Sequence, residues 1–532
     1  MIHQIKLSIG EKIGQLFLIG IGGEYLTKDE ENFIAENNIG FVILFSRNIS
    51  SPEQVRSLTD HIHSLGKIRP LIFIDQEGGL VIRLGETGST VISHMGLAAT
   101  GEKINGKKAA SIIGGEMKSL GIDGVFAPVL DVNSEKNNPV IGIRAFSDIP
   151  EIVADYGIEF AEGLREEKII PCGKHYPGHG YVSSDSHLEI PQSEIDIHYL
   201  FKINLHPFKK LFDKNIEAIM SAHVFYPEIN DEIGTFSQYF TEELLREELG
   251  FEGVVFSDCL EMNAVKDNYT EVEILDKILS GGVDVMSISK SLELQKKLYK
   301  LLMNKIKNHE IPEGKIESSL ERIIRLKEQY MPAEEKKETK NDLKLRVRLK
   351  EEIILAEKSI TMLRNDLKAV PIPKEKSCLI IDLKKRKHST DFSTGSSDNR
   401  LKDIADKYLV NHKILEMGQI GTGTANDKDE KILQKLKKFD HVIIFDFSFS
   451  PEMQEKKGVI NKILSIRKDA ILVASESPYI IADFPEAKTI LLTYGSRDVQ
   501  MDALFKILTG EKRPKGKLPV NISDTFSRGT GL

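Results

Sequence analysis

The chain has 532 residues, enough for several domains, and its composition of 40% hydrophobic and 29% charged residues is ordinary for a globular protein. The formal net charge of −8 argues against a general nucleic-acid binder, which needs a basic surface. No stretch is long and apolar enough to cross a bilayer, so no membrane association is expected.

The N-terminus and the cysteines favour a cytoplasmic protein. The first residues lack the basic, apolar and small-residue order of a signal peptide. The three cysteines, Cys172, Cys259 and Cys378, lie in or beside apolar runs. An odd and sparse set of this kind indicates reduced, packed thiols and no disulfide framework.

Eight apolar runs alternate with helical patterns in the first part of the chain, and they read as strands buried on both faces. The runs are residues 16–20, 41–45, 71–74, 125–129, 169–173, 218–221, 254–257 and 283–286. The helical patterns include residues 52–65, 107–120, 152–167, 200–215 and 241–248. Ser51 can cap the first of these helices, and Pro52 suits its first position. Eight such units in roughly 300 residues predict a (β/α)8 barrel, with an open doubly wound sheet as the competing arrangement.

Polar residues gather after these runs, where a barrel places its catalytic groups. The expected positions are Asp75 after the third run, Asp131 after the fourth, Lys174 and His175 after the fifth, His223 after the sixth and Asp258 after the seventh. This repeated placement is stronger evidence for a site than any single residue.

The pattern changes near residue 332, where a highly charged segment begins. We therefore predict a barrel domain over 1–332, a linker over 333–345 and a second domain over 346–532. The second domain has a helix from about residue 345 to 359 and strands at 377–382, 441–445, 470–474 and 489–493. This pattern predicts a smaller, mainly parallel α/β three-layer sandwich.

The loop from Lys174 to His187 is dense in titratable groups. Asp185 and His187 are two residues apart, so the carboxylate can hold one imidazole nitrogen while the other faces a substrate and moves a proton. For an isolated Asp-x-His, a solvated polar loop is the commoner explanation. His175 and His179 have a zinc-like spacing, but Pro177 and the neighbouring glycines disfavour a helix there, and no further ligands complete a site. No metal or cofactor is therefore predicted.

Asp258 directly follows the apolar run 254–257. A carboxylate in this position can cap a helix, or it can attack the anomeric carbon of a sugar, because it is both a good nucleophile and a workable leaving group. Local sequence does not choose between these two roles.

Five further charged residues could form a polar floor for a polyhydroxylated ligand, since carboxylates accept from paired hydroxyls while Arg and Lys donate. A buried salt-bridge network at the barrel rim is the alternative. These residues are Asp75, Arg83, Asp131, Arg144 and Lys174.

At these motifs the chain resembles glycoside hydrolase family 3, and within it the bacterial β-N-acetylglucosaminidases (β-hexosaminidases). The matching segments in the first domain are residues 75–79, 127–133, 138–144, 174–187 and 256–258. The loop pattern Lys-His-Tyr-Pro-Gly-His-Gly-x4-Asp-x-His is the most specific of them. Further similarity in the second domain lies at residues 358–365, 482–485 and 516–520.

The resemblance implies a retaining double displacement with Asp258 as the nucleophile, His187 as the general acid/base and Asp185 as its partner. It further implies that a terminal N-acetylglucosamine is held by Asp75, Arg83, Arg144, Lys174 and His175, and it places Asp131 and His223 near the pocket.

The leading hypothesis is an exo-acting β-N-acetylglucosaminidase acting on muropeptide or chito-oligosaccharide fragments. A phosphorylase using the same residues is the nearest enzymatic alternative, because a neutral His187 repels phosphate less than a carboxylate does. A non-catalytic sugar-binding barrel is the alternative from another class. A homodimer is possible from the presence of the second domain.

Overall fold

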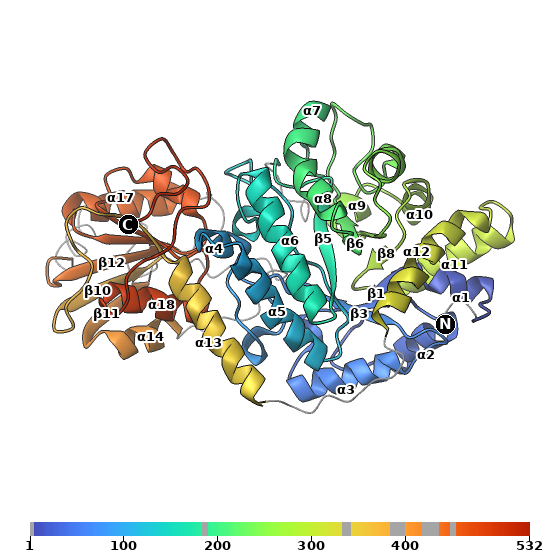
Figure 1. The fold of residues 1–532 in the computed structure, drawn as a ribbon, viewed down its shortest axis with the longest axis horizontal. Helices are drawn as coiled ribbons and strands as arrows, with labels where there is room; N and C mark the ends of the chain where they lie inside the picture. Colours follow the sequence, from blue (N-terminus) through green and yellow to red (C-terminus); the bar gives the residue numbers. More distant parts are fainter. Residues whose placement is uncertain (1–4, 183–189, 332–341, 384–399, 417–435, 447–453) are drawn as a thin grey trace.

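The structure is a computed structural model that describes residues 5–182, 190–331, 342–383, 400–416, 436–446 and 454–532. It has two α/β bodies, a larger one that contains the N-terminus and a smaller one that contains the C-terminus (Figure 1). In the described part of the chain, no helix has the length and apolar character needed to span a membrane.

The larger body is a closed parallel barrel, as predicted. Its strands pair in the order β7-β6-β5-β4-β3-β2-β1-β8, and a parallel bridge between Phe256 and Val285 joins the two ends. The strands are β1 (Phe17–Gly20), β2 (Phe41–Leu44), β3 (Leu71–Ile74), β4 (Gly124–Val125), β5 (Ile170–Tyr176), β6 (Ala218–Ser221), β7 (Val254–Ser257) and β8 (Met286–Ile288).

The helices of the barrel domain form its outer layer (Figure 1). They are α1 (Ile9–Gly14), α2 (Lys28–Asn37), α3 (Pro52–His63), α4 (His94–Ala99), α5 (Ile104–Ser119), α6 (Pro150–Glu166), α7 (Ile197–Tyr199), α8 (Leu205–Phe212), α9 (Asn263–Lys266), α10 (Glu271–Ser280), α11 (Leu292–Lys307) and α12 (Gly314–Tyr330), with π-helices over Leu200–Asn204 and Tyr239–Glu248. The predicted start of α3 is confirmed, because the Ser51 side chain accepts from the Gln54 amide and Pro52 occupies the first turn.

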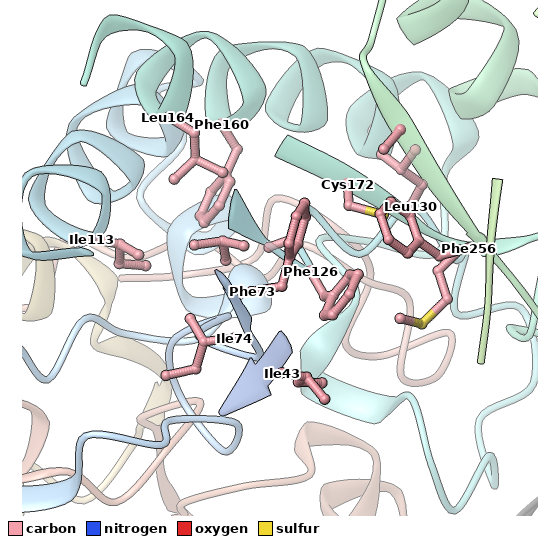
Figure 2. Packing of buried hydrophobic residues seen from close by; sticks show 14 of the residues in the cluster. Ile43, Phe73, Ile74, Ile113, Phe126, Leu130, Phe160, Leu164, Cys172 and Phe256 are labelled. Atoms are coloured by element: carbon pink, nitrogen blue, oxygen red, sulfur yellow. The ribbon is translucent and has the colours of Figure 1, made fainter. Parts of the chain in front are cut away.

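Phenylalanines from different strands fill the barrel interior. Phe73 packs on Phe126 with ring centroids 5.0 Å apart, and Phe256 lies 5.1 Å from both Phe41 and Phe73. Figure 2 shows Phe73, Phe126 and Phe256 in the barrel interior, with Ile113, Phe160 and Leu164 beside the helices outside the strands. Burying each of these side chains contributes about 1.5–3 kcal/mol to stability. Because the rings fill the barrel interior, a ligand has to bind at the carboxyl end of the strands.

The smaller body is a six-stranded mixed sheet in the order β11-β10-β12-β13-β14-β9. All neighbouring pairs are parallel except β14 with β9, which agrees with the mainly parallel prediction. The elements are β9 (Thr361–Asn365), β10 (Ser377–Asp382), β11 (Asn411–Glu416), β12 (His441–Asp446), β13 (Ile471–Ala474), β14 (Thr489–Leu492), α13 (Asp342–Ser359), α14 (Arg400–Tyr408), α17 (Gln454–Ile466) and α18 (Asp498–Leu508). Most of the predicted linker lies outside the described residues, and its last residues belong to α13.

The two bodies share a buried contact. Met95, Ala99 and Ile143 of the barrel domain belong to the hydrophobic cluster of the second sheet. Polar contacts surround it: the Ser93 hydroxyl donates to the Tyr494 carbonyl at 2.6 Å, and Asn133 donates to the Tyr479 hydroxyl at 2.8 Å. The contact therefore lies against loops that follow the barrel strands, and Figure 1 shows α4 facing the second domain.

Candidate active site

Charged side chains from β3 and β5 meet at the carboxyl end of the barrel. Lys174 donates to Asp75 at 2.8 Å, and Arg83 donates to the other Asp75 oxygen at 3.2 Å. Burial alone would raise the pKa of Asp75, but the charges of Lys174 and Arg83 lower it below its ordinary value. Asp75 is thus an ionised acceptor held between two cations.

Lys174 and His175 lie inside the strand β5, whereas the sequence placed them in the loop that follows. The strand continues to Tyr176, with an irregular register against β6 between Lys174 and Tyr176. Their side chains are consequently fixed by the barrel wall, and the loop proper begins at Pro177.

Arg144 joins this cluster through Glu77. Its Nε and Nη2 donate to the two Glu77 oxygens at 2.9 and 2.8 Å, and its Nη1 donates to the Val140 carbonyl at 3.2 Å. Its own carbonyl accepts from His94 Nδ1 at 2.7 Å. Burial lowers the pKa of His94 to about 4, so this ring is neutral and holds the Arg144 backbone as a donor.

His175 is held by Asp131. His175 Nδ1 lies 2.7 Å from one Asp131 oxygen, and the other oxygen accepts from the His179 amide at 2.5 Å. The Asp131 side chain is fully buried. We therefore assign Asp131 the task of orienting His175, whose Nε2 is left facing Arg144 at 3.4 Å.

His223 plays a similar part for the segment that carries Asp258. Its Nδ1 lies 2.9 Å from the Thr235 hydroxyl and its Nε2 lies 3.2 Å from the Cys259 carbonyl. Burial lowers the pKa of His223, so the ring is a neutral hydrogen-bonding group. His175 on β5 and Asp258 after β7 lie at the carboxyl ends of strands that flank β6, after which His223 follows.

Asp258 follows β7 directly, as predicted. One of its carboxylate oxygens accepts from the Cys259 amide at 2.7 Å, and its own amide donates to the Ser221 carbonyl at 3.2 Å. Burial raises the pKa of the neighbouring Cys259 thiol to about 11, so this cysteine is a neutral packing residue.

The segment after Asp75 turns sharply and depends on glycine. Gly78 and Gly79 have φ values of +93° and +59°, and a Cβ on Gly79 would lie 2.5 Å from that of Ser93. Arg497 of the second domain donates to the Gly79 carbonyl at 2.9 Å. The second domain thus restrains a loop of the candidate site, although Arg497 lies outside the barrel domain.

Two predicted residues, Asp185 and His187, lie outside the described residues. Their roles therefore stay predictions from the sequence.

Two residues of the site were missed by the sequence reasoning. Glu77 lies within the matching segment 75–79 without a predicted role, although a second carboxylate two residues after Asp75 was a usable signal. Phe45, which ends the β2 region, stacks beneath Arg83 with the guanidinium carbon 5.3 Å from the ring centroid. No local pattern distinguishes Phe45 from the other apolar residues of its run.

His175 and His179 have a spacing like that of zinc ligands. Within the described ranges, no group of three or more His, Cys, Asp or Glu side chains is arranged to hold a metal ion. His175 Nδ1 instead contacts Asp131.

Comparison with known proteins gives a family match over the barrel. Residues 8–326, more than half of the chain, match the model of the "Glycosyl hydrolase family 3 N terminal domain".

Two curated relatives, both named beta-hexosaminidase, match about half of the chain. The protein of Alkalilimnicola ehrlichii is 40% identical over 256 residues, which are 47% of this chain and 73% of the relative. That of Chromobacterium violaceum is 37% identical over 277 residues, or 51% of this chain and 77% of the relative.

Solved structures extend the similarity to both domains. A family 3 β-N-acetylglucosaminidase from Paenibacillus sp. str. FPU-7 superposes with a TM-score of 0.88 at 30% identity, covering 97% of this chain and 99% of that one. A β-glucoside phosphorylase superposes with a TM-score of 0.81 over 97% of this chain, but at 20% identity it shares the fold alone.

Proposed function

This chain belongs to glycosyl hydrolase family 3, and from that premise we propose that it is an exo-acting, retaining β-N-acetylglucosaminidase. Its substrate would be a short oligosaccharide with N-acetylglucosamine at the non-reducing end. The single observation that carries the proposal is the convergence of Asp75, Lys174, Arg144 and His175 beside the strand end that bears Asp258.

In the first step, an Asp258 oxygen attacks the anomeric carbon while His187 gives a proton to the departing glycosidic oxygen. The bond between sugar and aglycone breaks, and an ester between the sugar and Asp258 forms. Asp185 would hold the His187 ring and stabilise its protonated form before the transfer.

In the second step, neutral His187 takes a proton from water, and the water oxygen attacks the same carbon. The ester breaks, Asp258 leaves as a carboxylate, and His187 is protonated again. Two inversions give a product with the β configuration.

The charged cluster would bind the terminal sugar. Asp75 can accept from a pair of hydroxyls, while Arg83 and Lys174 can donate. His175 Nε2 can accept from a further hydroxyl, because Nδ1 faces the Asp131 carboxylate. The contacts that hold these side chains at the ends of β3 and β5 favour a single sugar orientation, which is what exo-cleavage requires.

Turnover of 4-nitrophenyl N-acetyl-β-glucosaminide tests the proposal. We expect release of nitrophenol by the wild type and a loss of roughly a thousandfold or more in Asp258→Ala. Trapping with a 5-fluoro-N-acetylglucosaminyl fluoride, followed by peptide mapping, should label Asp258. A label on another residue, or normal turnover by Asp258→Ala, would refute the mechanism.

Product analysis separates hydrolysis from phosphorolysis. In phosphate buffer we expect free N-acetylglucosamine as the product. Accumulation of the sugar 1-phosphate would instead identify the enzyme as a phosphorylase. Tight binding of the sugar without turnover would favour a non-catalytic sugar-binding protein. Parallel assays with a muropeptide fragment and a chito-oligosaccharide then identify the natural substrate class.

A further inference from the structure

Glu77 is a buried carboxylate whose bonding capacity is used within the protein. One oxygen forms an ion pair with Lys174 Nζ at 2.7 Å and accepts from Arg144 Nη2 at 2.8 Å, while the other accepts from Arg144 Nε at 2.9 Å. Its side chain is only 2% exposed. These three contacts occupy most of the acceptor positions of the carboxylate, and its burial leaves Glu77 little access to a sugar hydroxyl.

The charges around Glu77 favour its ionised form. Burial alone would raise the pKa of Glu77, but the charges of Arg144 and Lys174 lower it well below its ordinary value. In return, Asp75 and Glu77 raise the pKa of Lys174 despite its burial. Each partner thus keeps the other charged although the side chains are almost fully buried.

The two cations bound by Glu77 come from different parts of the barrel. Arg144 lies in the segment that follows β4, and Lys174 lies in β5. Without a shared anion, they would repel each other in a medium of low dielectric constant. Glu77 fixes their separation and the direction of the Arg144 guanidinium plane, because a bidentate pair has a defined geometry.

We propose that Glu77 is the positioning residue of the sugar site: it sets where Arg144 and Lys174 present their donors to the terminal N-acetylglucosamine. This inference rests on the proposed function and adds a residue to it. Glu77 does not contact the substrate, and its effect passes through the two cations.

The alternative is that Glu77 serves only the stability of the barrel rim. Both roles predict a less stable protein when its charge is removed, so stability alone cannot separate them. A positioning role also predicts weaker sugar binding in the molecules that remain folded, which a purely structural role does not.

The experiment compares Glu77→Gln with Glu217→Gln. Glu217 is a matched control, because it is a buried carboxylate that also binds an arginine bidentately, with Arg165 Nε and Nη2 at 2.8 and 2.9 Å. It precedes β6 and so lies at the opposite end of the barrel from Asp258. Its removal should lower stability and leave sugar binding unchanged.

With 4-nitrophenyl N-acetyl-β-glucosaminide, we expect Glu77→Gln to raise KM about tenfold or more, with a smaller change in kcat. The inhibition constant of free N-acetylglucosamine should rise by the same factor. Glu217→Gln should keep the wild-type KM and inhibition constant. Equal values for Glu77→Gln and the wild type, or a fall in kcat at unchanged KM, would overturn the inference.

Glu77→Asp is the second variant, because it keeps the charge and its shorter side chain can reach only one of the two cations. We expect it to fold and to show a KM between those of the wild type and Glu77→Gln. If neither Glu77 variant folds while Glu217→Gln does, Glu77 is a stability residue and the inference fails. If the wild type itself does not cleave the substrate, the proposed function fails, and the two failures are thus distinguishable.

Discussion

At the scale of single residues, the site separates carboxylates that face the protein from those that can face a substrate. The Asp131 carboxylate contacts His175 and His179, and the Glu77 carboxylate contacts Arg144 and Lys174. Asp75, in contrast, is the more exposed member of its ion pairs. A buried carboxylate that is already fully hydrogen-bonded orients its partners, because binding a ligand would require breaking those bonds.

Asp131→Asn should therefore reduce activity without abolishing it. The variant loses the charge beside His175 Nδ1, and a buried hydrogen bond to a charged group is worth about 1.5–3 kcal/mol. We expect kcat/KM to fall roughly ten- to a hundredfold. Steady-state kinetics on the aryl glycoside measures this.

Asp123→Asn is the control for that variant. Asp123 is another buried aspartate paired with a histidine, His63, at 2.9 Å, but it precedes β4 at the far end of the barrel. Its substitution should lower thermal stability at unchanged KM. A similar loss of activity in both variants would show that the Asp131 effect is only one of folding.

At the scale of elements, helix α13 lies between the barrel and the second sheet and carries a buried carboxyl group, Glu352. Glu352 is almost fully buried and accepts from the Thr90 amide at 3.1 Å. Burial raises the pKa of Glu352 to about 7, and the nearby charge of Glu116 adds to the effect. This raised pKa indicates that the ionised form is poorly solvated where α13 packs on the barrel.

The sign of the pH effect follows from this shift. The folded pKa lies above the ordinary value of 4.5, so the folded state binds a proton that the unfolded state releases between those two pH values. The stabilisation is complete below pH 4.5 and is lost as the pH rises through 7. Glu352→Gln mimics the protonated form and should be more stable than the wild type at pH 8, by about 3 kcal/mol, and equal to it at about pH 4.

Thermal unfolding at the two pH values checks this prediction. Glu357→Gln on the same helix is the control, because hydrogen bonds to Lys512 and Lys506 outweigh burial and lower the pKa of Glu357. That variant should lose stability at pH 8. A Glu352→Gln protein that is less stable than the wild type at pH 8 would contradict the argument.

At the scale of the whole molecule, the second domain supports the barrel's binding loops. Arg497, just before α18, donates to the Gly79 carbonyl, and Tyr479 accepts from Asn133. Both barrel residues lie in segments that follow a strand carrying site residues. The second domain therefore restrains the loops after β3 and β4, although the barrel alone holds the charged cluster.

Arg497→Ala should loosen the segment that carries Asp75 and Glu77. We expect a fall of about five- to tenfold in kcat/KM, since the hydrogen bonds from a charged donor to the Gly79 and Leu80 carbonyls are lost. Arg364→Ala is the matched control, because Arg364 donates to the Pro485 and Ala487 carbonyls within the second domain. Unchanged kinetics in Arg497→Ala would show that the loop keeps its shape without the second domain.

The fold class and the family could both be predicted from the amino-acid sequence. The predicted barrel strands overlap those observed because each is a short apolar run buried on both faces, and such runs are local signals. The strands β9 and β11 were missed, since β11 at the sheet edge has a mostly exposed face and lacks such a run. The positions of Asp75 and Asp258 after their strands were predicted for the same reason.

Which charged side chains contact one another depends on the tertiary structure. Glu77 and Arg144 are 67 residues apart and Asp75 and Lys174 are 99 apart, yet each pair is in hydrogen-bonding contact because barrel closure brings strand ends together. The residues around each member of such a pair do not identify its partner. The sequence was therefore compatible with both a sugar-binding polar floor and a salt-bridge network at the rim. The structure shows that Asp131 contacts His175 and that Glu77 contacts Arg144 and Lys174.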